Sequence, residues 1–161
     1  MGIVIMNVKI VCVGNIKDDF FKDAVKEYEK RLSKFVNLKI IEVKEERLPK
    51  NYSLADINNV VEQESNREIS LLEGYVILCG VGGKEFTSPQ FADKLKKLEQ
   101  SFSSITFVVG GSYGVSDLLK SKADMILGFG EFTYPHQLFR VMLVEQIYRA
   151  YTIINNITYH K

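Results

Sequence analysis

The chain has few of the residues on which cross-linked and metal-containing folds depend. Its 161 residues include only two cysteines and two histidines. Two cysteines are too few for a disulfide framework, and with the two histidines they lack the spacing of a zinc site. Because Cys12 and Cys79 both lie in apolar, strand-like runs, we expect a reducing, cytoplasmic environment and no bound metal.

Long apolar runs are also missing. The first residues are apolar, but Lys9 ends the run and no basic leader precedes it, so this segment is a poor signal peptide. No other segment reaches the roughly 20 apolar residues that span a membrane. Apolar residues make up 46% of the chain and charged residues 25%, a balance typical of one globular domain. We therefore expect no membrane partner.

Charge of one sign is not in excess either. The net charge is only +1, so no overall field attracts a nucleic acid. One local basic feature remains on a predicted helix, with Arg31 beside it. Its lysines follow i,i+4 spacing: Lys22, Lys26, Lys30 and Lys34. Asp23, Glu27 and Glu29 partly neutralise this row, which fits two interpretations, a solvated helix face and a basic contact surface.

Common nucleotide-binding and hydrolase motifs are absent from the sequence. Residues 80–84 faintly resemble a phosphate-binding loop, but the first glycine of that motif is missing and Glu85 replaces its Ser or Thr. No G-x-G-x-x-G motif opens a helix after the first strand, which argues against a dinucleotide-binding unit. A G-x-S-x-G elbow is missing too.

Predicted strands and helices alternate along the chain. Apolar runs predict strands near residues 8–13, 38–43, 75–81, 105–109 and 124–128. Helical spacing and capping signals predict helices near residues 18–34, 53–72, 88–101, 115–121 and 136–155. Ser53 with Asp56 resembles a capping box, and Ser88 with Pro89 suits an N-cap and first turn. This alternation indicates an α/β fold with a mostly parallel sheet and helices on both faces.

Two glycine-rich turns follow the last two predicted strands. The first is Gly110-Gly111-Ser112-Tyr113-Gly114, and the second begins at Gly128 and continues to His136. Glycine lets the backbone approach a ligand closely, and parallel sheets bind ligands at the carboxyl ends of their strands. The two turns therefore predict a cofactor pocket lined largely by main chain.

The predicted final helix is apolar on two sides. One stripe contains Leu138, Val141, Met142, Tyr148 and Tyr151. The other contains Phe139, Leu143, Ile147, Ala150 and Ile154. A helix of this kind must be covered on two sides. We expect one side to pack on the sheet and the other on a second subunit in a two-fold dimer; the alternative is a central helix in a monomer.

Several short motifs, in order along the chain, carry a family resemblance. In the last third they are Gly110-Gly111-Ser112-x-Gly114, Thr133-Tyr134-Pro135-His136-Gln137, Arg140-Val141, Glu145-Gln146-x-Tyr148-Arg149-Ala150 and Tyr159-His160-Lys161. Near the start they are Val13-Gly14 and Glu27-Tyr28-x-Lys30-Arg31-Leu32. Together they closely resemble the RlmH (YbeA-type) family of methyltransferases. The resemblance covers residues 6–161 as a single domain and leaves residues 1–5 as an N-terminal extension.

This resemblance implies an S-adenosylmethionine-dependent enzyme of the SPOUT class, an α/β homodimer with a C-terminal trefoil knot. The reaction it implies is methylation of N3 of a pseudouridine in a stem-loop of 23S rRNA, on the assembled ribosome. The knot comes from the resemblance alone, because general topology rules favour an unknotted sheet.

The resemblance also implies which residues form the site. It places the cofactor contacts at Cys79, Gly110, Phe129, Gly130, Glu131, Phe132, Thr133 and Tyr134, and Cys79 stands where relatives often have Leu. The N3–H group must lose its proton, which requires a base or a charge that stabilises the anion. The candidates are Tyr159 and His160 in the tail, which could act across a dimer interface, and Arg140 and His136 near the cofactor loop.

Each candidate also has a purely structural interpretation. A terminal Tyr-His-Lys is ordinarily frayed, His136 could cap the final helix, and Arg140 could pair with a carboxylate such as Glu145. Two other functions compete with the methyltransferase. One is a non-catalytic dimer that binds a nucleotide-like ligand; the other is an NAD-dependent oxidoreductase, which the missing glycine fingerprint disfavours.

Overall fold

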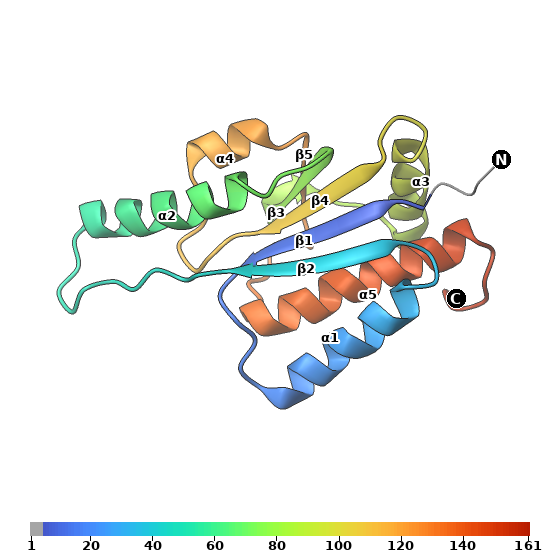
Figure 1. Cartoon of the computed structure of the whole chain (residues 1–161), viewed down its shortest axis with the longest axis horizontal. Coiled ribbons are helices and arrows are strands. Elements are labelled where there is room, and N and C mark those ends of the chain that lie inside the picture. The colour runs from blue at the N-terminus through green and yellow to red at the C-terminus, as the bar shows by residue number, and fades with distance from the viewer. Residues whose placement is uncertain (1–4) are drawn as a thin grey trace.

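The computed structural model describes residues 5–161, and of the expected N-terminal extension only Ile5 falls within that range. Its five strands are β1 (Asn7–Val13), β2 (Asn37–Val43), β3 (Tyr75–Lys84), β4 (Ser104–Val109) and β5 (Met125–Leu127). They form one sheet in the order β2-β1-β4-β3-β5, and every neighbouring pair is parallel (Figure 1). The predicted parallel α/β sheet is therefore confirmed.

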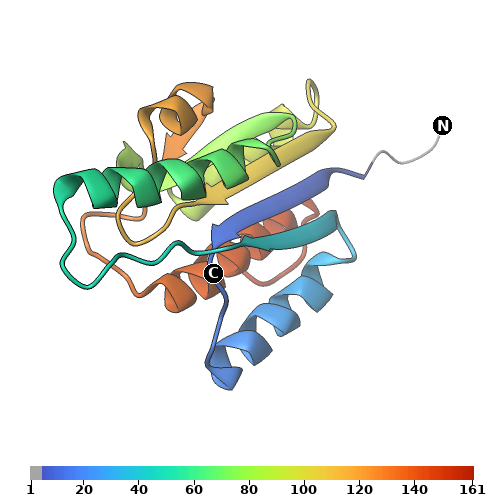
Figure 2. The same ribbon diagram turned by 60° about the vertical axis from the view of Figure 1, so that its left-hand side comes forward.

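Five helices cover the two faces of this sheet. They are α1 (Asp19–Leu32), α2 (Leu54–Ile69), α3 (Ser88–Leu98), α4 (Asp117–Lys122) and α5 (His136–Ile154). Figures 1 and 2 show α2 and α4 on one face and α1 and α5 on the other, where α3 packs beside α5. Helices on both faces are thus also confirmed. No helix in residues 5–161 is long and apolar enough to cross a membrane.

The starts of α2 and α3 have the predicted capping signals, with one correction. The predicted capping box of Ser53 and Asp56 opens α2. The N-cap of α3, however, is Thr87 and not Ser88. Thr87 is the cap because Gln90 stands three residues later. The Gln90 side-chain oxygen accepts from the Thr87 N–H, and the Thr87 hydroxyl oxygen accepts from the Gln90 N–H. The Ser88 hydroxyl instead donates to Gln146 on α5, with 3.0 Å between the oxygens.

The apolar core is divided unequally between the faces. The larger part lies between the sheet and α1, α3 and α5, and includes Phe107, Leu143 and Ile147, none of them exposed. The smaller part, under α2 and α4, contains four buried residues: Val76, Leu78, Val108 and Leu119. On this second face α2 also buries Glu64, Ser65 and Glu68. One face is therefore an apolar core, whereas the other has a polar layer beside its apolar cluster.

Helix α5 has the two-sided character predicted for it. Leu143, Ile147 and Ala150 are buried in the core beside the sheet. On the other stripe Tyr151 is buried, but Leu138 is 37% exposed and Met142 lines a surface cavity. Part of one apolar stripe therefore remains accessible in the single chain.

Candidate cofactor cavity and catalytic tail

A cavity of about 480 Å³ lies at the carboxyl ends of β3, β4 and β5, within the usual size range of small-molecule sites. Both predicted glycine turns form its walls. Seven of the eight expected cofactor residues line it: Cys79, Gly110, Phe129, Gly130, Phe132, Thr133 and Tyr134. Glu131 is exposed and does not line it. The fold thus brings two turns that are separate in sequence into one site.

The first turn requires glycine because the structure behind it is tightly packed. A Cβ on Gly110 would lie 2.5 Å from Val115 Cγ1, and one on Gly111 would lie 2.3 Å from Glu64 Oε1. Gly114 has a φ of +89°, a conformation that side chains rarely adopt. The end of the turn is attached to α2, because the Ser116 N–H donates to Ser65 Oγ over 2.9 Å. Helix α2 therefore holds this wall of the cavity in position.

The second turn is closed by its own side chains. The Tyr134 hydroxyl donates to the Phe129 carbonyl oxygen over 3.0 Å, which links the two ends of residues 129–134. The Phe129 ring packs edge-on against Phe139 of α5, with the ring centroids 4.8 Å apart. Phe132 points outward and is 81% exposed. This loop is therefore a stiff wall anchored on α5, with one free aromatic ring at its rim.

Cys79 occupies the end of β3, in register with Val109 of β4 and Leu127 of β5. Burial raises the pKa of its thiol well above its usual range, so the side chain is a neutral, weakly polar group at physiological pH. It can therefore replace the leucine of relatives as an apolar wall, since thiols behave as small hydrophobic groups when buried.

The four catalytic candidates are not brought together within one chain. His136 lines the cavity at the start of α5. Arg140, one turn later, is only 6% exposed and does not line it. Its Nη2 donates to the carbonyl oxygens of Val13 and Gly14, each at 2.7 Å, and its Nη1 pairs with Glu42 at 2.8 Å. Arg140 therefore ties the end of β1 to α5, and its carboxylate partner is Glu42, not Glu145.

Tyr159 and His160 lie at the far end of α5, and both are held there. The Tyr159 hydroxyl donates to Glu145 Oε1 over 3.1 Å, and Arg149 forms an ion pair with the same oxygen at 2.6 Å. Arg149 Nη1 is also 3.2 Å from His160 Nδ1, and its guanidinium lies over the Tyr159 ring. The tail is thus bonded to α5 and not frayed, but it does not line the cofactor cavity.

Protonation in this tail network follows from its contacts. Burial, with hydrogen bonding to Tyr28 and Glu145, raises the pKa of Tyr159 to about 12, so its phenol is a hydrogen-bond donor at neutral pH. Arginine can only donate, so Nδ1 of His160 is the acceptor in its contact with Arg149. In this state the tail offers donors and positive charge, which suit stabilisation of a developing anion.

Glu145 and Arg149 are candidates for the chemistry that the sequence reasoning did not select; it offered Arg149 only as a phosphate contact. Both belong to one of the motifs that carried the resemblance, and their i,i+4 spacing places them on one side of α5. That spacing was the available signal. The spacing does not show that the tail folds back onto Glu145 and Arg149, because residues 155–158, which connect α5 to the tail, could leave the helix in many directions.

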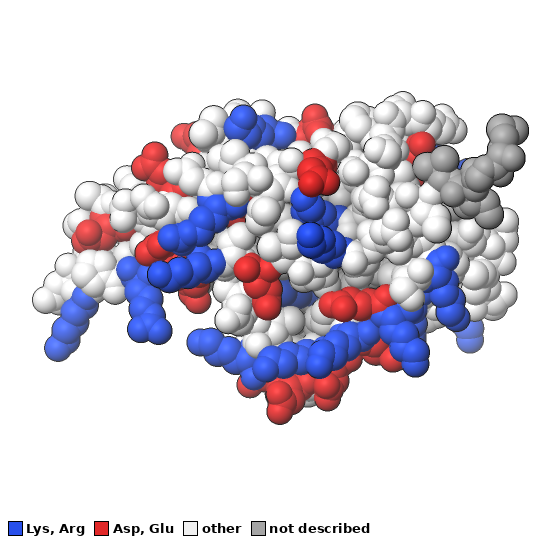
Figure 3. Space-filling view, in the orientation of Figure 1, with Lys and Arg blue, Asp and Glu red and all other residues white. Residues whose placement is uncertain are grey.

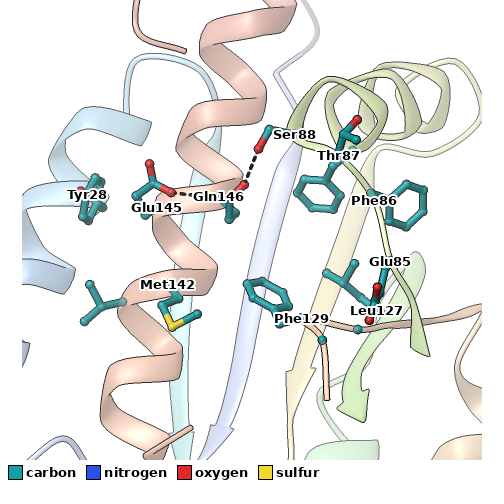
Figure 4. Close-up of a pocket in the computed structure, with 14 residues that line it drawn as sticks. Tyr28, Glu85, Phe86, Thr87, Ser88, Leu127, Phe129, Met142, Glu145 and Gln146 are labelled. Carbon is teal, nitrogen blue, oxygen red and sulfur yellow. Dashed lines mark hydrogen bonds between the residues drawn. The ribbon is translucent and has the colours of Figure 1, made fainter. Parts of the chain in front are cut away.

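A second cavity, of about 530 Å³, adjoins this network (Figure 4). Glu145 and Gln146 of α5 face it from one side, and Ser88 of α3 from the other. Gln146 accepts from Ser88 and donates to Glu145 Oε2 over 2.9 Å. Leu127, Phe129 and Gly130 line both cavities, so this short segment separates them. In residues 5–161 no cluster of His, Cys, Asp or Glu could hold a metal ion.

Fold and cavity together define the class: an α/β protein whose ligand site lies at the carboxyl edge of a parallel sheet, between glycine turns. A sequence profile described as "Predicted SPOUT methyltransferase" matches residues 6–160. The chain therefore belongs to the SPOUT methyltransferase family.

Individual relatives agree with this assignment. The "Ribosomal RNA large subunit methyltransferase H" of Lactobacillus acidophilus is 45% identical, over 97% of this chain and the full length of the relative. The protein of the same name from Streptococcus uberis is 43% identical over the same shares. Among solved structures, a probable methylase family protein from Haemophilus influenzae aligns with a TM-score of 0.56 and 14% identity, over 97% of this chain and 71% of that one. The last similarity supports the fold alone.

Proposed function

We propose that this protein uses S-adenosylmethionine to methylate N3 of a pseudouridine in a 23S rRNA stem-loop, on the assembled ribosome in the cytoplasm. The observation that carries the proposal is the glycine-walled cavity at the carboxyl edge of the sheet, in a chain of the SPOUT methyltransferase family. The names of the curated relatives support ribosomal RNA of the large subunit as the substrate. The proposal includes a trefoil knot in the last third of the chain, as in the family resemblance.

The residues present fit this cofactor. Lys120 is the only Lys, Arg, Asp or Glu side chain along the cavity wall in residues 5–161, so main chain and aromatic rings would make most contacts. The rings of Phe129 and Tyr134 suit both an adenine face and a sulfonium cation. Gly110 and residues 129–134 would hold the cofactor. When bound, it supplies an electrophilic methyl group, and the protein supplies position and electrostatics.

The tail is the group best suited to act on the target base. Removal of the N3 proton leaves negative charge on the acceptor base, which the remaining N–H groups of the Arg149 guanidinium can stabilise; the Tyr159 phenol can add a hydrogen bond once its O–H turns from Glu145 to the base. His160 can accept this N3 proton at Nδ1 once its imidazole no longer contacts Arg149. Glu145 orients both Arg149 and Tyr159. These roles require the tail to reach a methyl donor bound in a cofactor cavity.

A homodimer would bring the tail and a cofactor cavity together. In one chain the tail is bonded to Glu145, near the middle of the 19-residue α5, whereas His136, at the start of that helix, lines the cofactor cavity. The accessible apolar stripe of α5, with Leu138 and Met142, gives a face on which a second copy could pack. We propose that this packing places the tail of one subunit at the cofactor cavity of the other.

The decisive experiment is methyl transfer from labelled S-adenosylmethionine to ribosomes from cells that lack the endogenous modification, with free 23S rRNA tested beside them. We expect label in the RNA of intact ribosomes, mapping to N3 of one pseudouridine. Cofactor binding in a calorimeter without transfer to either substrate would contradict the proposal. That result would favour a non-catalytic, ligand-binding dimer instead.

A further inference from the structure

The lysine row of α1 is a continuous cationic band on the surface. Lys22, Lys26, Lys30 and Lys34 are all exposed. Figure 3 shows a blue band along the helix at the lower edge of the molecule, with the acidic residues of that helix below it. Lys22, Lys26 and Lys30 of α1 are about 6 Å apart along the helix axis, since each residue rises about 1.5 Å, and Lys34 follows just beyond the end of the helix. The band therefore presents regularly spaced positive charges on one side of α1.

These charges are little used within the protein. Lys22 lies 3.9 Å from Asp19, and no other lysine of the row has a carboxylate within 4 Å in residues 5–161. Glu27, which could have neutralised the row, pairs instead with Arg31 at 3.2 Å. Exposed pairs such as these stabilise a fold only weakly. Maintenance of the fold therefore does not explain the row.

One end of the row lies next to the cofactor cavity. Gln137 Oε1 accepts from the main-chain N–H groups of Lys17 and Asp18, at 2.9 and 3.1 Å, just before α1 begins. Gln137 follows His136, which lines that cavity. Lys22 then borders a hollow of about 260 Å³ that Arg140 also lines. The start of α1 is thus fixed next to the start of α5, beside the cofactor cavity.

The other end of the row lies next to the tail. The Arg31 guanidinium lies 5.3 Å from the ring centroid of Tyr28 and 5.7 Å from that of Tyr148. The Tyr148 ring in turn packs edge-on against Tyr159, with the centroids 4.9 Å apart. Helix α1 therefore runs alongside α5 from the region of the cofactor cavity to the region of the tail.

We propose that the α1 lysine row binds backbone phosphates of the ribosomal RNA that surrounds the target nucleotide. Lysine ammonium groups bind phosphates as flexible point charges, and phosphate contacts position a protein on RNA without reading its sequence. A membrane surface is disfavoured because the apolar side of α1, with Val25 and Leu32, is buried in the protein. This proposal rests on the proposed ribosomal substrate.

The test compares two variants with equal loss of charge. The row variant carries Lys22→Gln, Lys26→Gln, Lys30→Gln and Lys34→Gln. The control variant carries the same change at four exposed lysines elsewhere: Lys50, Lys96, Lys97 and Lys122. For the row variant we expect KM for ribosomes to rise at least tenfold, with cofactor affinity unchanged. The salt dependence of log(kcat/KM) should flatten by about 0.7 for each phosphate of single-stranded RNA that the row no longer neutralises. Arginine in place of lysine at the same four positions should preserve both the KM for ribosomes and the salt dependence of the wild type.

Co-sedimentation with ribosomes, over a range of salt and without cofactor, tests the row independently of methyl transfer. If the wild type transfers no methyl group but binds ribosomes through the row, the proposed reaction fails and the RNA surface stands. If the row and control variants lose equal affinity, only net charge matters and the surface proposal is overturned. Unchanged binding by the row variant would overturn it as well.

Discussion

The two faces of the sheet differ in what they bury. The face covered by α1, α3 and α5 holds most of the apolar core. The face under α2 and α4 has a small apolar cluster and, next to it, the buried acids Glu64 and Glu68. Glu64 backs Gly111 in the wall of the candidate cofactor cavity, whereas the tail proposed to be catalytic is attached to α5 on the opposite face. One face therefore provides most of the stability, and the other shapes the cofactor site at some cost in stability.

Matched leucine truncations test this comparison most strongly. Leu143 on α5 and Leu119 on α4 are both fully buried. We expect Leu143→Ala to lower the free energy of unfolding by about 4 kcal/mol and Leu119→Ala by about 2 kcal/mol, since short α4 can collapse onto its cavity more easily. Denaturant unfolding monitored by circular dichroism would measure both. Equal losses would mean that the two faces share the core energetically.

Tail variants should affect chemistry without affecting the fold. We expect Tyr159→Phe and His160→Ala each to lower kcat about a hundredfold, equivalent to about 2.7 kcal/mol. Cofactor affinity, measured by calorimetry, should be unchanged because both residues are proposed to act on the target base and neither is among the proposed cofactor contacts. Unchanged turnover in both variants would remove the tail from the mechanism.

Mixed dimers would show whether the tail works across subunits. A His160→Ala chain retains a cofactor cavity, and a chain with Gly110 replaced by a larger residue retains a tail. If the tail acts on the partner, mixing the two inactive variants should restore part of the activity. Absence of restored activity in dimers shown to be mixed would place tail and cavity in the same chain.

Glu68 makes the stability of the polar face depend on pH. It is fully buried, and neither carboxyl oxygen has a hydrogen-bond partner among the described residues. Burial, reinforced by Glu64, raises its pKa to about 9. The raised pKa means that the folded protein keeps a proton that the unfolded chain releases above about pH 4.5, so stability falls as pH rises from there to about 9.

The expected slope is about 1 kcal/mol per pH unit for this one group. Glu68→Gln removes the titration, so between pH 6 and 8 the variant should gain about 2 kcal/mol relative to the wild type. Urea unfolding at pH 5, 6.5 and 8 would show it. Parallel pH profiles for the two proteins would mean that Glu68 is solvated or paired in solution.

The smallest expected effect lies where the polar face meets the cavity. In Gly111→Ala the new methyl group would collide with Glu64 Oε1, and displacement of the turn should weaken cofactor binding about tenfold, or 1.4 kcal/mol. Glu64→Ala in the same chain removes the colliding oxygen and should restore much of the affinity. If the double variant binds no better than Gly111→Ala alone, the contact with α2 is not what positions this turn.

The sequence predicted the architecture well because its signals are local. Alternating apolar runs and capping residues placed all ten elements to within a few residues, and the glycine turns pointed to the cavity that both of them line. The strand order did not follow from them, because local signals do not determine which strands are neighbours. Thr87 was missed as a cap because Thr87 and Ser88 are both good N-cap residues. The feature that distinguishes them is Gln90, which lies three residues after Thr87 and completes its capping box.

Long-range side-chain contacts account for the remaining differences. Arg140 was expected near the cofactor loop or paired with Glu145, five residues along its own helix, but its partners lie more than 90 residues away in β1, in the turn that follows β1, and in β2. No periodicity within α5 reports such contacts. The return of Tyr159 onto Glu145 is likewise a tertiary event, and the roles of the site residues stay predictions for the experiments above.

The position of β2 has a consequence for solubility. The strand order leaves it at the edge of the sheet, where β1 is its only pairing partner within residues 5–161. Exposed edges of this kind invite other chains to add strands, which is a common route to aggregation. Lys39 and Asn37 are exposed along β2, and a charged or polar edge disfavours such stacking. Replacing Lys39 with an apolar β-branched residue should therefore promote self-association of folded molecules at high concentration. The cofactor cavity should not change, because it lies at the carboxyl ends of β3, β4 and β5, away from β2.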